Sequence, residues 1–111
     1  MRQYEIWWAR LPAAIGRRPV LLLTRTPAVR YLNKVIVVEI TTTIRDIPVE
    51  LPLGPAEGLR RESVANFDNM HVIAKGSLDE RIGALAENRV REAKRCLGWA
   101  LDWPELKHPA R

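Results

Sequence analysis

Short runs of apolar, β-branched and aromatic residues, separated by polar or Gly/Pro-containing stretches, fill most of the chain, and this pattern is typical of β-strands. Residues 4–11 form the first such run and residues 20–24 the second. The connection between the two runs spans only residues 11–16, which favours an antiparallel pair.

Residues 35–43 are the densest β-branched run in the chain and turn polar near Thr41, where we expect the strand to leave the core. Before that run, residues 24–34 contain a proline, two arginines and an asparagine, and they predict an exposed loop. Residues 49–53 alternate apolar and polar positions. Pro52 within them predicts an edge strand, because proline has no N–H to donate to a neighbouring strand.

Residues 54–62 are rich in Gly, Pro and charge and predict a loop. The next strand is expected over residues 63–73, with a bulge at its polar centre. The sequence from Ser77 to Glu80 has the spacing of a capping box, which predicts a single helical turn. A last short strand is expected over residues 81–85.

From residue 87 to 101 the period of the apolar positions changes from two to that of a helix, with one stripe through Val90, Ala93 and Leu97. Pro104 ends this pattern, and residues 104–111 are expected to form a polar, frayed tail. The fold class predicted is mainly β with α: a small curled β-sheet or barrel with a C-terminal amphipathic helix, forming one domain over residues 1–103.

Arg18 stands directly before Pro19 and the buried run that follows it. Pro19 is expected at the first position of that strand, where its missing N–H costs no hydrogen bond. Arg18 then lies at the end of a packed strand with its guanidinium in solvent. A permanently charged, planar group held in that way suits the rigid binding of an anion.

Charge and cysteine content narrow the classes of partner and compartment. The 111 residues include 18 Lys and Arg against 13 Asp and Glu, for a net charge of +5. This excess favours a polyanionic partner, although a merely basic surface remains an alternative. Cys96 is alone, so no intrachain disulfide forms, and its helical position indicates a buried, unreactive thiol. With no signal or membrane-spanning segment evident, we expect a cytoplasmic protein.

Four segments of the sequence together resemble the MazF/PemK toxins, the sequence-cutting endoribonucleases of type II toxin–antitoxin modules. The segments are EIWWARL at residues 5–11, GRRPVLLLT at 16–24, VEITT at 38–42 and VANFDNMH at 64–71. The last has the form found in an actinobacterial-type branch of the family. The resemblance covers nearly the whole chain.

The resemblance implies an SH3-like β-barrel of the CcdB/PemK type that acts as a homodimer. It also implies that Arg18 and Thr41 form the catalytic pair, with no metal and no cofactor. In such an enzyme the 2′-hydroxyl of a single-stranded RNA attacks the adjacent phosphate, leaving a 2′,3′-cyclic phosphate and a 5′-hydroxyl. No metal-ligand spacing occurs in the chain, which agrees with a metal-free reaction. An acidic, partly disordered antitoxin is the expected partner.

Further residues are candidates for substrate binding, each with a structural alternative. Arg17 and Thr42 flank the expected catalytic pair, and His71 is a candidate acid, base or RNA contact. The amide and carboxylate groups of the polar strand centre suit base recognition, or else stabilise the bulge through local backbone bonds. These are Asn66, Asp68 and Asn69.

The tryptophans have packing roles to assign as well. Trp7 and Trp8 are expected on opposite faces of the first strand. Trp99 and Trp103 lie about one helical turn apart and are expected to pack on the barrel.

The sequence departs from the family at three places. The connection at residues 11–16 is shorter than the family's usual loop, Tyr4 replaces a glycine, and His71 replaces a basic residue. These departures leave the RNA sequence specificity open.

Two other functions remain as alternatives. One is a gyrase poison of the CcdB type, which relies on a Trp-Gly-Ile C-terminus where this chain has Trp103-Pro104-Glu105. The other is an SH3-like module that binds RNA or protein without cleaving it. The different C-terminal sequence counts against the gyrase poison, and the intact pair of Arg18 and Thr41 counts against the non-cleaving module.

Overall fold

A computed structural model describes residues 1–108, and six strands make up most of it. They are β1 (Glu5–Arg10), β2 (Arg17–Leu22), β3 (Lys34–Thr41), β4 (Glu50–Leu53), β5 (Ser63–Ala74) and β6 (Leu78–Ala84). The helices are α1 (Thr26–Val29), α2 (Val90–Leu101) and α3 (Pro104–Lys107). Three 3-10 turns complete the elements: η1 (Pro55–Glu57), η2 (Lys75–Ser77) and η3 (Glu87–Arg89).

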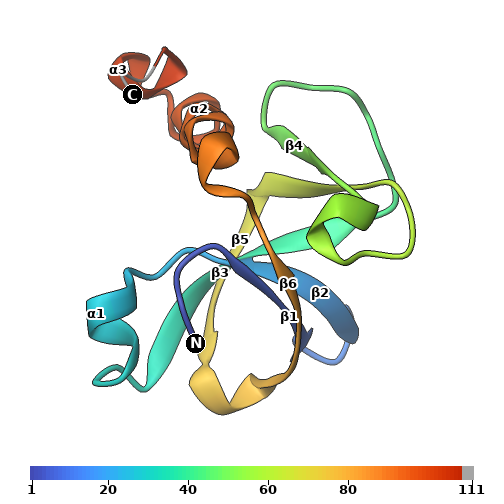
Figure 1. The fold of residues 1–111 in the computed structure, drawn as a ribbon, viewed down its shortest axis with the longest axis vertical. Coiled ribbons are helices and arrows are strands. Elements are labelled where there is room, and N and C mark those ends of the chain that lie inside the picture. The colour runs from blue at the N-terminus through green and yellow to red at the C-terminus, as the bar shows by residue number, and fades with distance from the viewer. Residues whose placement is uncertain (109–111) are drawn as a thin grey trace.

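All six strands belong to one antiparallel sheet in the order β4-β5-β3-β2-β1-β6. The sheet curls into an open barrel, and α2 lies across one end of it (Figure 1). This confirms the predicted fold class and the predicted pairing of the first two strands. It also confirms that β4 is an edge strand. Pro52 suits an edge strand because it has no backbone N–H to donate to a further strand.

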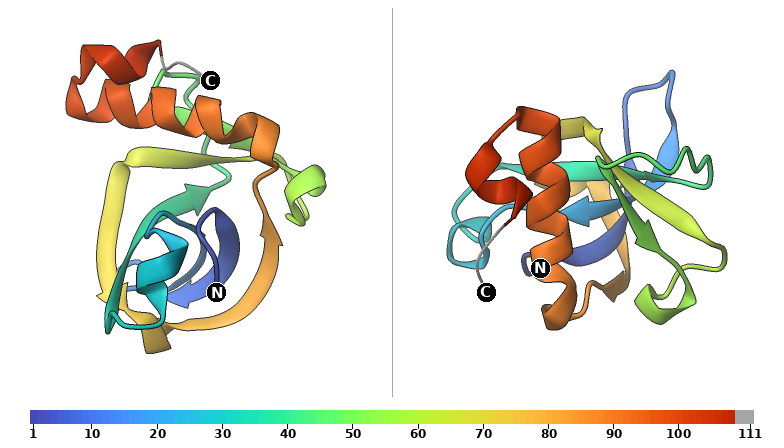
Figure 2. Two further views of the ribbon diagram at one scale, coloured as in Figure 1. Left: turned by 60° about the vertical axis from the view of Figure 1, so that its left-hand side comes forward. Right: turned by 90° about the horizontal axis from the view of Figure 1, so that it is seen from above.

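β5 bends sharply in the middle, as the left view of Figure 2 shows. The bend has its origin in the register with β3, where Val38 pairs with Met70 but Ile40 pairs with Ala65. Glu39 alone therefore stands opposite four residues of β5, and the predicted bulge is confirmed. The bend lets one long strand pair with both β3 and β4, which curls the sheet.

Two apolar clusters fill the two faces of this curled sheet. The larger lies between the sheet and α2 and is centred on Phe67, Ile6 and Leu21, with Ala93 and Cys96 contributed by the helix. The smaller contains Val20, Leu22, Val35, Val37 and Ile73 together with Ala9, Leu11 and Leu78. Alternate residues of β2 and β3 point into different clusters, as the period of a strand requires.

Residues 24–34 are mostly exposed, as predicted, but the prediction of a loop was wrong for the short helix α1 within them. Pro27 lies in the first turn of α1, a position that proline favours because the N–H it lacks would have no helical partner. Ala28 and Val29 are buried, and the Thr24 hydroxyl accepts the N–H of Ile36 at 2.8 Å. The segment is thus packed against the sheet.

The capping box predicted from Ser77 to Glu80 is also wrong, because residues 78–84 form strand β6 along β1. The single turn, η2, comes before it. Strand pairing with β1 satisfies more backbone groups than one isolated helical turn would, so tertiary context overrides the local signal.

The chain after Pro104 differs from the frayed tail that was expected. Residues 104–107 form helix α3, with Pro104 in its first turn. Helix α3 packs on α2 at Gly98, where any side chain would collide with Leu106 of α3. Trp99 and Trp103 do not pack on the barrel; 44% and 47% of their surfaces are exposed, and the Lys107 ammonium lies over the Trp99 ring. The rest of the expected tail, residues 109–111, lies outside the described residues.

The segment between β4 and β5 folds back against β6 at one end of the barrel. Gly58 has φ of +92°, and a side chain there would collide with the Ile82 carbonyl; a side chain at Gly83 would collide with the Glu57 carbonyl. Two glycines are therefore needed for η1 and β6 to approach this closely. None of the helices in the described part of the chain has the length and apolar character to span a membrane.

Candidate active site

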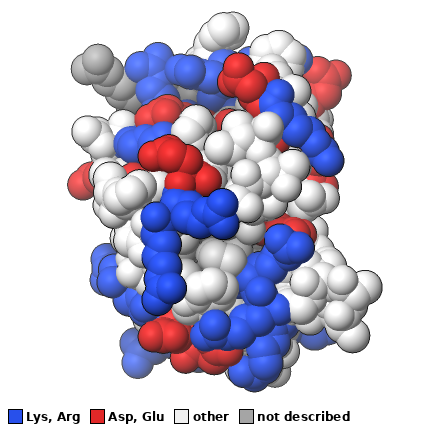
Figure 3. Space-filling view, turned by 90° about the vertical axis from the view of Figure 1, so that its right-hand side faces the viewer, with Lys and Arg blue, Asp and Glu red and all other residues white. Residues whose placement is uncertain are grey.

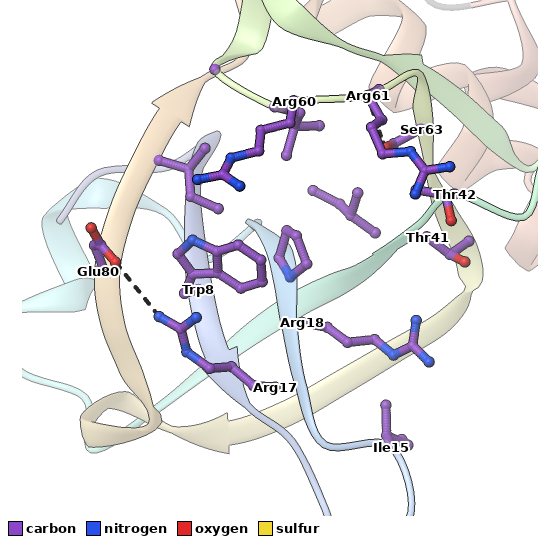
Figure 4. Close-up of a pocket in the computed structure, with 15 residues that line it drawn as sticks. Trp8, Ile15, Arg17, Arg18, Thr41, Thr42, Arg60, Arg61, Ser63 and Glu80 are labelled. Atoms are coloured by element: carbon purple, nitrogen blue, oxygen red, sulfur yellow. Dashed lines mark hydrogen bonds and ion pairs between the residues drawn. The ribbon is translucent and has the colours of Figure 1, made fainter.

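An open cavity of about 740 Å³ lies at the end of the barrel where β2 begins and β3 ends. Arg18 and Thr41 both line it. Val20 pairs with Glu39 across β2 and β3, and continuing this register by two residues sets Arg18 beside Thr41. In Figure 4 the Arg18 guanidinium points to the side of β2 on which Thr41 and Thr42 lie. The structure therefore brings the two residues expected as a catalytic pair into one site.

The position of Pro19 explains how Arg18 is presented. Pro19 is the third residue of β2 and pairs with Trp8 of β1, so it does not open the strand as predicted. Pairing with β3, however, begins only at Val20. Proline thus occupies the last position before the β2–β3 ladder, where its missing N–H leaves no gap. Arg18 lies just beyond the end of that ladder, with 41% of its side chain exposed.

The Arg18 side chain is held from one side only. Its Nε lies 3.4 Å from Glu39 Oε1, on β3. This Nε is buried and makes no hydrogen bond, and within residues 1–108 Arg18 has no other ion pair. Because Nε faces the protein, the two terminal amino groups of the guanidinium stay available to a ligand.

Thr41 has a hydroxyl whose role is partly set by the backbone. Its oxygen accepts a hydrogen bond of 3.1 Å from the N–H of Thr43, just past the end of β3. A hydroxyl that already accepts from the backbone retains its own O–H to donate. Thr42 is exposed at the rim of the same cavity. The pair of Arg18 and Thr41 therefore offers donors to an anion.

Arg17 points to the opposite side of β2 and is already engaged. Its guanidinium donates to Asp79 at 3.1 and 3.4 Å, lies 3.6 Å from Glu80, and covers the Trp8 ring at 4.4 Å (Figure 4). This Arg17–Asp79 hydrogen bonding lowers the pKa of Asp79 and raises the pKa of Arg17. Arg17 lines the cavity as part of a network on β1, β2 and β6.

Two arginines that sequence reasoning did not single out overhang the cavity. Arg60 and Arg61 come from the segment before β5; Arg60 points down toward Trp8 of β1, and Arg61 points down toward Thr42 at the end of β3 (Figure 4). Neither side chain has an ion pair or hydrogen bond with another described residue. The sequence does show a second Arg-Arg pair, but because the pair lies in a loop, the sequence did not indicate where its side chains point.

The cavity is strongly basic as a result. Four arginines line it, against a single acidic residue, Glu80. Figure 3 views the molecule from the side where the cavity opens and shows Lys and Arg side chains gathered across the centre and lower half of this face. Such a surface attracts phosphate-bearing chains, which the net charge alone only suggested.

The polar centre of β5 is not part of this cavity. Asn66 is buried, and its side-chain oxygen accepts the N–H of Asp68 at 2.9 Å, as expected for a residue that stabilises the bulge. Asp68 and Asn69 are exposed beside the bend. His71 does not line the cavity; its Nε2 lies 3.2 Å from the second oxygen of Glu39. Within the described residues no three His, Cys, Asp or Glu side chains are grouped to hold a metal.

An open antiparallel barrel with an arginine-lined cavity and a Thr hydroxyl at its edge defines a small protein built to bind a polyanion. The family model of the PemK-like, MazF-like toxins of type II toxin–antitoxin systems matches residues 2–101. The chain therefore belongs to this family of toxins. The resemblance found in the sequence is confirmed.

Relatives and solved structures agree with this assignment. The chain is 37% identical over 99 residues to the probable endoribonuclease MazF5 of Mycobacterium tuberculosis, covering 88% of this chain and 90% of that protein. It is 39% identical over 94 residues to the probable endoribonuclease MazF2 of the same species, covering 84% and 90%.

Two solved structures have the same fold over most of their length. The M. tuberculosis toxin MazF-mt6 superposes with a TM-score of 0.84 at 35% identity, covering 88% of this chain and 96% of that one. A mycobacterial endoribonuclease in complex with its cognate antitoxin superposes with a TM-score of 0.82 at 26% identity, covering 94% and 97%.

Proposed function

We propose that this toxin is an endoribonuclease that cuts single-stranded RNA without a metal, and that Arg18 and Thr41 are its catalytic residues. The observation that carries the proposal is their meeting at one end of the barrel, in a cavity with two further arginines whose side chains have no partner among residues 1–108. Membership of a family whose relatives are named endoribonucleases supports the activity.

The reaction needs little from the enzyme beyond alignment and charge. The bond from the 2′-oxygen to phosphorus forms while the bond from phosphorus to the 5′-oxygen breaks. The proton lost by the 2′-hydroxyl is balanced by the proton gained by the 5′-oxygen, and the products are a 2′,3′-cyclic phosphate and a 5′-hydroxyl. Negative charge develops on the non-bridging phosphate oxygens, where fixed donors stabilise the transition state more than the ground state.

Each donor takes a part of this work in the proposed mechanism. The terminal amino groups of Arg18 form a planar fork that matches two phosphate oxygens. The Thr41 O–H donates to the same phosphate, and Thr42 lies next to it at the rim. Arg60 and Arg61 hold the neighbouring phosphates, since RNA must run as an extended single strand to allow in-line attack.

Other expected substrate contacts are retained only where the side chain is accessible. Arg17 presents a guanidinium stacked on Trp8 beside the cavity, where it is placed to meet a flanking nucleotide. Asp68 and Asn69 are exposed at the bend of β5 and suit contacts farther along the strand of RNA. Asn66 is excluded from this set because it is buried and bonded to the backbone.

The decisive experiment is cleavage of a long, largely unstructured RNA in the presence of EDTA, with wild type compared with Arg18→Ala. We expect discrete cuts that EDTA does not prevent, with 5′-hydroxyl ends that need phosphorylation before ligation, and no cuts by the variant. Mapping those ends also gives the recognised sequence. RNA left intact by wild type, or cut equally by the variant, would move the assignment to a toxin that binds without cleaving.

We further propose that the toxin works in the cytoplasm as a homodimer and that an acidic, partly disordered antitoxin neutralises it by covering the arginine-lined cavity. Ile36 and Val72 pair across β3 and β5 with 45% and 66% of their surfaces exposed, and such an apolar pair on a sheet favours burial against a second copy. The structure of a similar mycobacterial endoribonuclease with its cognate antitoxin supports an antitoxin as partner. Light scattering should give twice the chain mass of 12.7 kDa.

A further inference from the structure

A single carboxylate, that of Glu39, lies between the proposed catalytic arginine and a histidine. Glu39, on β3, lies with Oε1 3.4 Å from Arg18 Nε on β2 and with Oε2 3.2 Å from His71 Nε2 on β5. Its side chain is 14% exposed, less than either partner at 41% and 22%. Each carboxylate oxygen thus has one partner, and the three residues come from three adjacent strands.

Strand register places the three side chains together. Glu39 stands opposite Val20, and Arg18 is two residues before Val20, so Arg18 and Glu39 are diagonal neighbours on one face of the sheet. On the other side of β3, His71 stands opposite Val37, two residues before Glu39, which makes His71 a diagonal neighbour on the same face. This face is the one that carries the smaller apolar cluster.

A carboxylate at the edge of an apolar cluster is costly unless it is paired, so its presence needs a reason. The bend of β5 leaves Glu39 opposite four residues, on the face that carries the smaller apolar cluster. The residue at this position is an acid, and it forms an ion pair with Arg18, whose Nε is buried and has no hydrogen-bond partner among the described residues. The ion pair is therefore built around Arg18.

We propose that Glu39 is a positioning residue: it fixes the Arg18 guanidinium from the Nε side, so that the two terminal amino groups face the scissile phosphate. This role rests on the proposed ribonuclease function. An arginine that is 41% exposed and unrestrained samples many rotamers, and alignment before the reaction is a large part of catalysis of this kind. His71 holds the second oxygen and keeps the carboxylate from rotating away.

The same carboxylate must weaken the attraction of the site for RNA, because it places a negative charge beside the phosphate. Alignment and attraction therefore change in opposite directions when Glu39 loses its charge. This gives a signature that a residue needed only for folding would not give: a lower kcat with an unchanged or lower KM.

The test measures kcat and KM on an RNA oligonucleotide that contains the mapped cleavage site, for wild type, Glu39→Gln and Glu39→Asp. We expect Glu39→Gln to lower kcat by about 10- to 100-fold with KM unchanged or reduced. Glu39→Asp keeps the charge but shortens the side chain by one methylene, so its kcat should lie between those of wild type and Glu39→Gln. Glu105→Gln removes one negative charge from the exposed surface of α3 and serves as the control for net charge; it should match wild type.

A second readout does not depend on activity. In an NMR spectrum of the arginine Nε–H groups, the Arg18 signal is assigned by its loss in Arg18→Lys. It should be a single resonance, distinct from those of the mobile arginines, in wild type and should merge with them in Glu39→Gln. Thermal unfolding of each variant verifies the fold.

The outcomes separate the two proposals. Wild type that leaves RNA uncut overturns the ribonuclease function, and with it this role of Glu39. Wild type that cuts, with an equal or higher kcat in a folded Glu39→Gln, overturns the positioning role alone. An Arg18 Nε–H signal that does not change in Glu39→Gln also overturns it.

Discussion

At the scale of single residues, the site depends on groups whose hydrogen-bonding capacity is left partly unused. Arg18 uses its Nε toward Glu39, and Thr41 accepts from the backbone, so the free donors of both point to one cavity. Arg17, one residue away on β2, has its donors taken by Asp79. Two adjacent arginines of equal charge thus have different roles because a strand sends neighbouring side chains to opposite faces.

The first prediction concerns the hydroxyl of Thr41. Thr41→Val keeps the branched shape that suits the end of β3 but removes the donor to the phosphate, and we expect a loss in kcat of roughly 100-fold. Thr41→Ser keeps the hydroxyl and should retain most of the activity. The measurement is single-turnover cleavage of the mapped RNA site. Equal activity of the Val variant and wild type would remove Thr41 from the catalytic pair.

Cys96, in α2, is the subject of a second prediction. Burial among the residues between α2 and the sheet raises the pKa of this thiol to about 11, and its surface is 6% exposed, as its predicted character of an unreactive buried thiol requires. At pH 7 the native protein should therefore react with a thiol-specific chromogenic reagent only as fast as it unfolds. The same protein in denaturant should react within seconds. Rapid labelling of the native protein would show that the Cys96 thiol is not buried.

At the scale of elements, the strands were predictable because dense β-branched runs have few alternatives to a sheet, and the bulge was predictable because polar residues interrupt one such run. The short helices were missed for a common reason. Pro27 and Pro104 were interpreted as breaks, whereas each lies in the first turn of a helix. Whether a proline ends one element or begins another depends on tertiary packing, which local sequence does not contain.

The candidate site was predictable to a similar degree. Arg18 and Thr41 were named by resemblance, and β2–β3 pairing brings them together. Arg60 and Arg61 were missed, because their direction depends on the close approach of η1 to β6 through Gly58 and Gly83. Glu39 was missed because its neighbours on β2 and β5 are known only once the register is known.

The pairing of β1 with β6 leads to a prediction on pH. Burial raises the pKa of Glu5, but the hydrogen bonds from Arg81, the Arg2 N–H and the Trp7 indole together lower it by more than burial raises it. The pKa of Glu5 in the folded protein therefore lies below the usual 4.5. A lowered pKa means that the carboxylate stabilises the fold above pH 4.5, and that this contribution disappears as the pH falls through the folded value.

Urea unfolding at several pH values measures this effect. The free energy of unfolding of wild type should decrease as the pH drops below about 4.5, and Glu5→Gln should show a shallower decrease. The two proteins should differ most near neutral pH and least at a pH below the folded-state pKa of Glu5. Asp79 and Glu92, whose pKa values are also lowered by arginine partners, should account for part of the decrease that remains. Parallel curves for the two proteins would show that Glu5 does not contribute.

At the scale of the whole molecule, one end of the barrel concentrates positive charge that the sequence distributes over distant segments. Arg17 and Arg18 are the first two residues of β2, while Arg60 and Arg61 follow β4 in the chain, and the curl of the sheet brings them around one cavity (Figure 4). Such a cavity attracts RNA irrespective of its sequence, and base recognition then has to come from side chains around the rim.

The last prediction separates this attraction from catalysis. In a Thr41→Val background, whose loss of kcat of roughly 100-fold limits RNA cleavage during the measurement, the logarithm of the binding constant should fall linearly with the logarithm of salt concentration. Replacing both Arg60 and Arg61 by Ala should weaken binding at low salt and reduce that slope by about 1.4, since each phosphate contact to a single strand contributes about 0.7. Arg95→Ala, on the exposed side of α2, is the matched control and should leave the slope unchanged.

The slope distinguishes two ways in which the overhanging arginines can act. If they contact phosphates directly, each removes a counterion from the RNA and the slope records it. If they only shape the cavity, affinity falls without a change in slope. An unchanged slope in the double variant would therefore place Arg60 and Arg61 outside the path of the RNA, and Arg18 and the accessible residues of β5 would then be the main contacts.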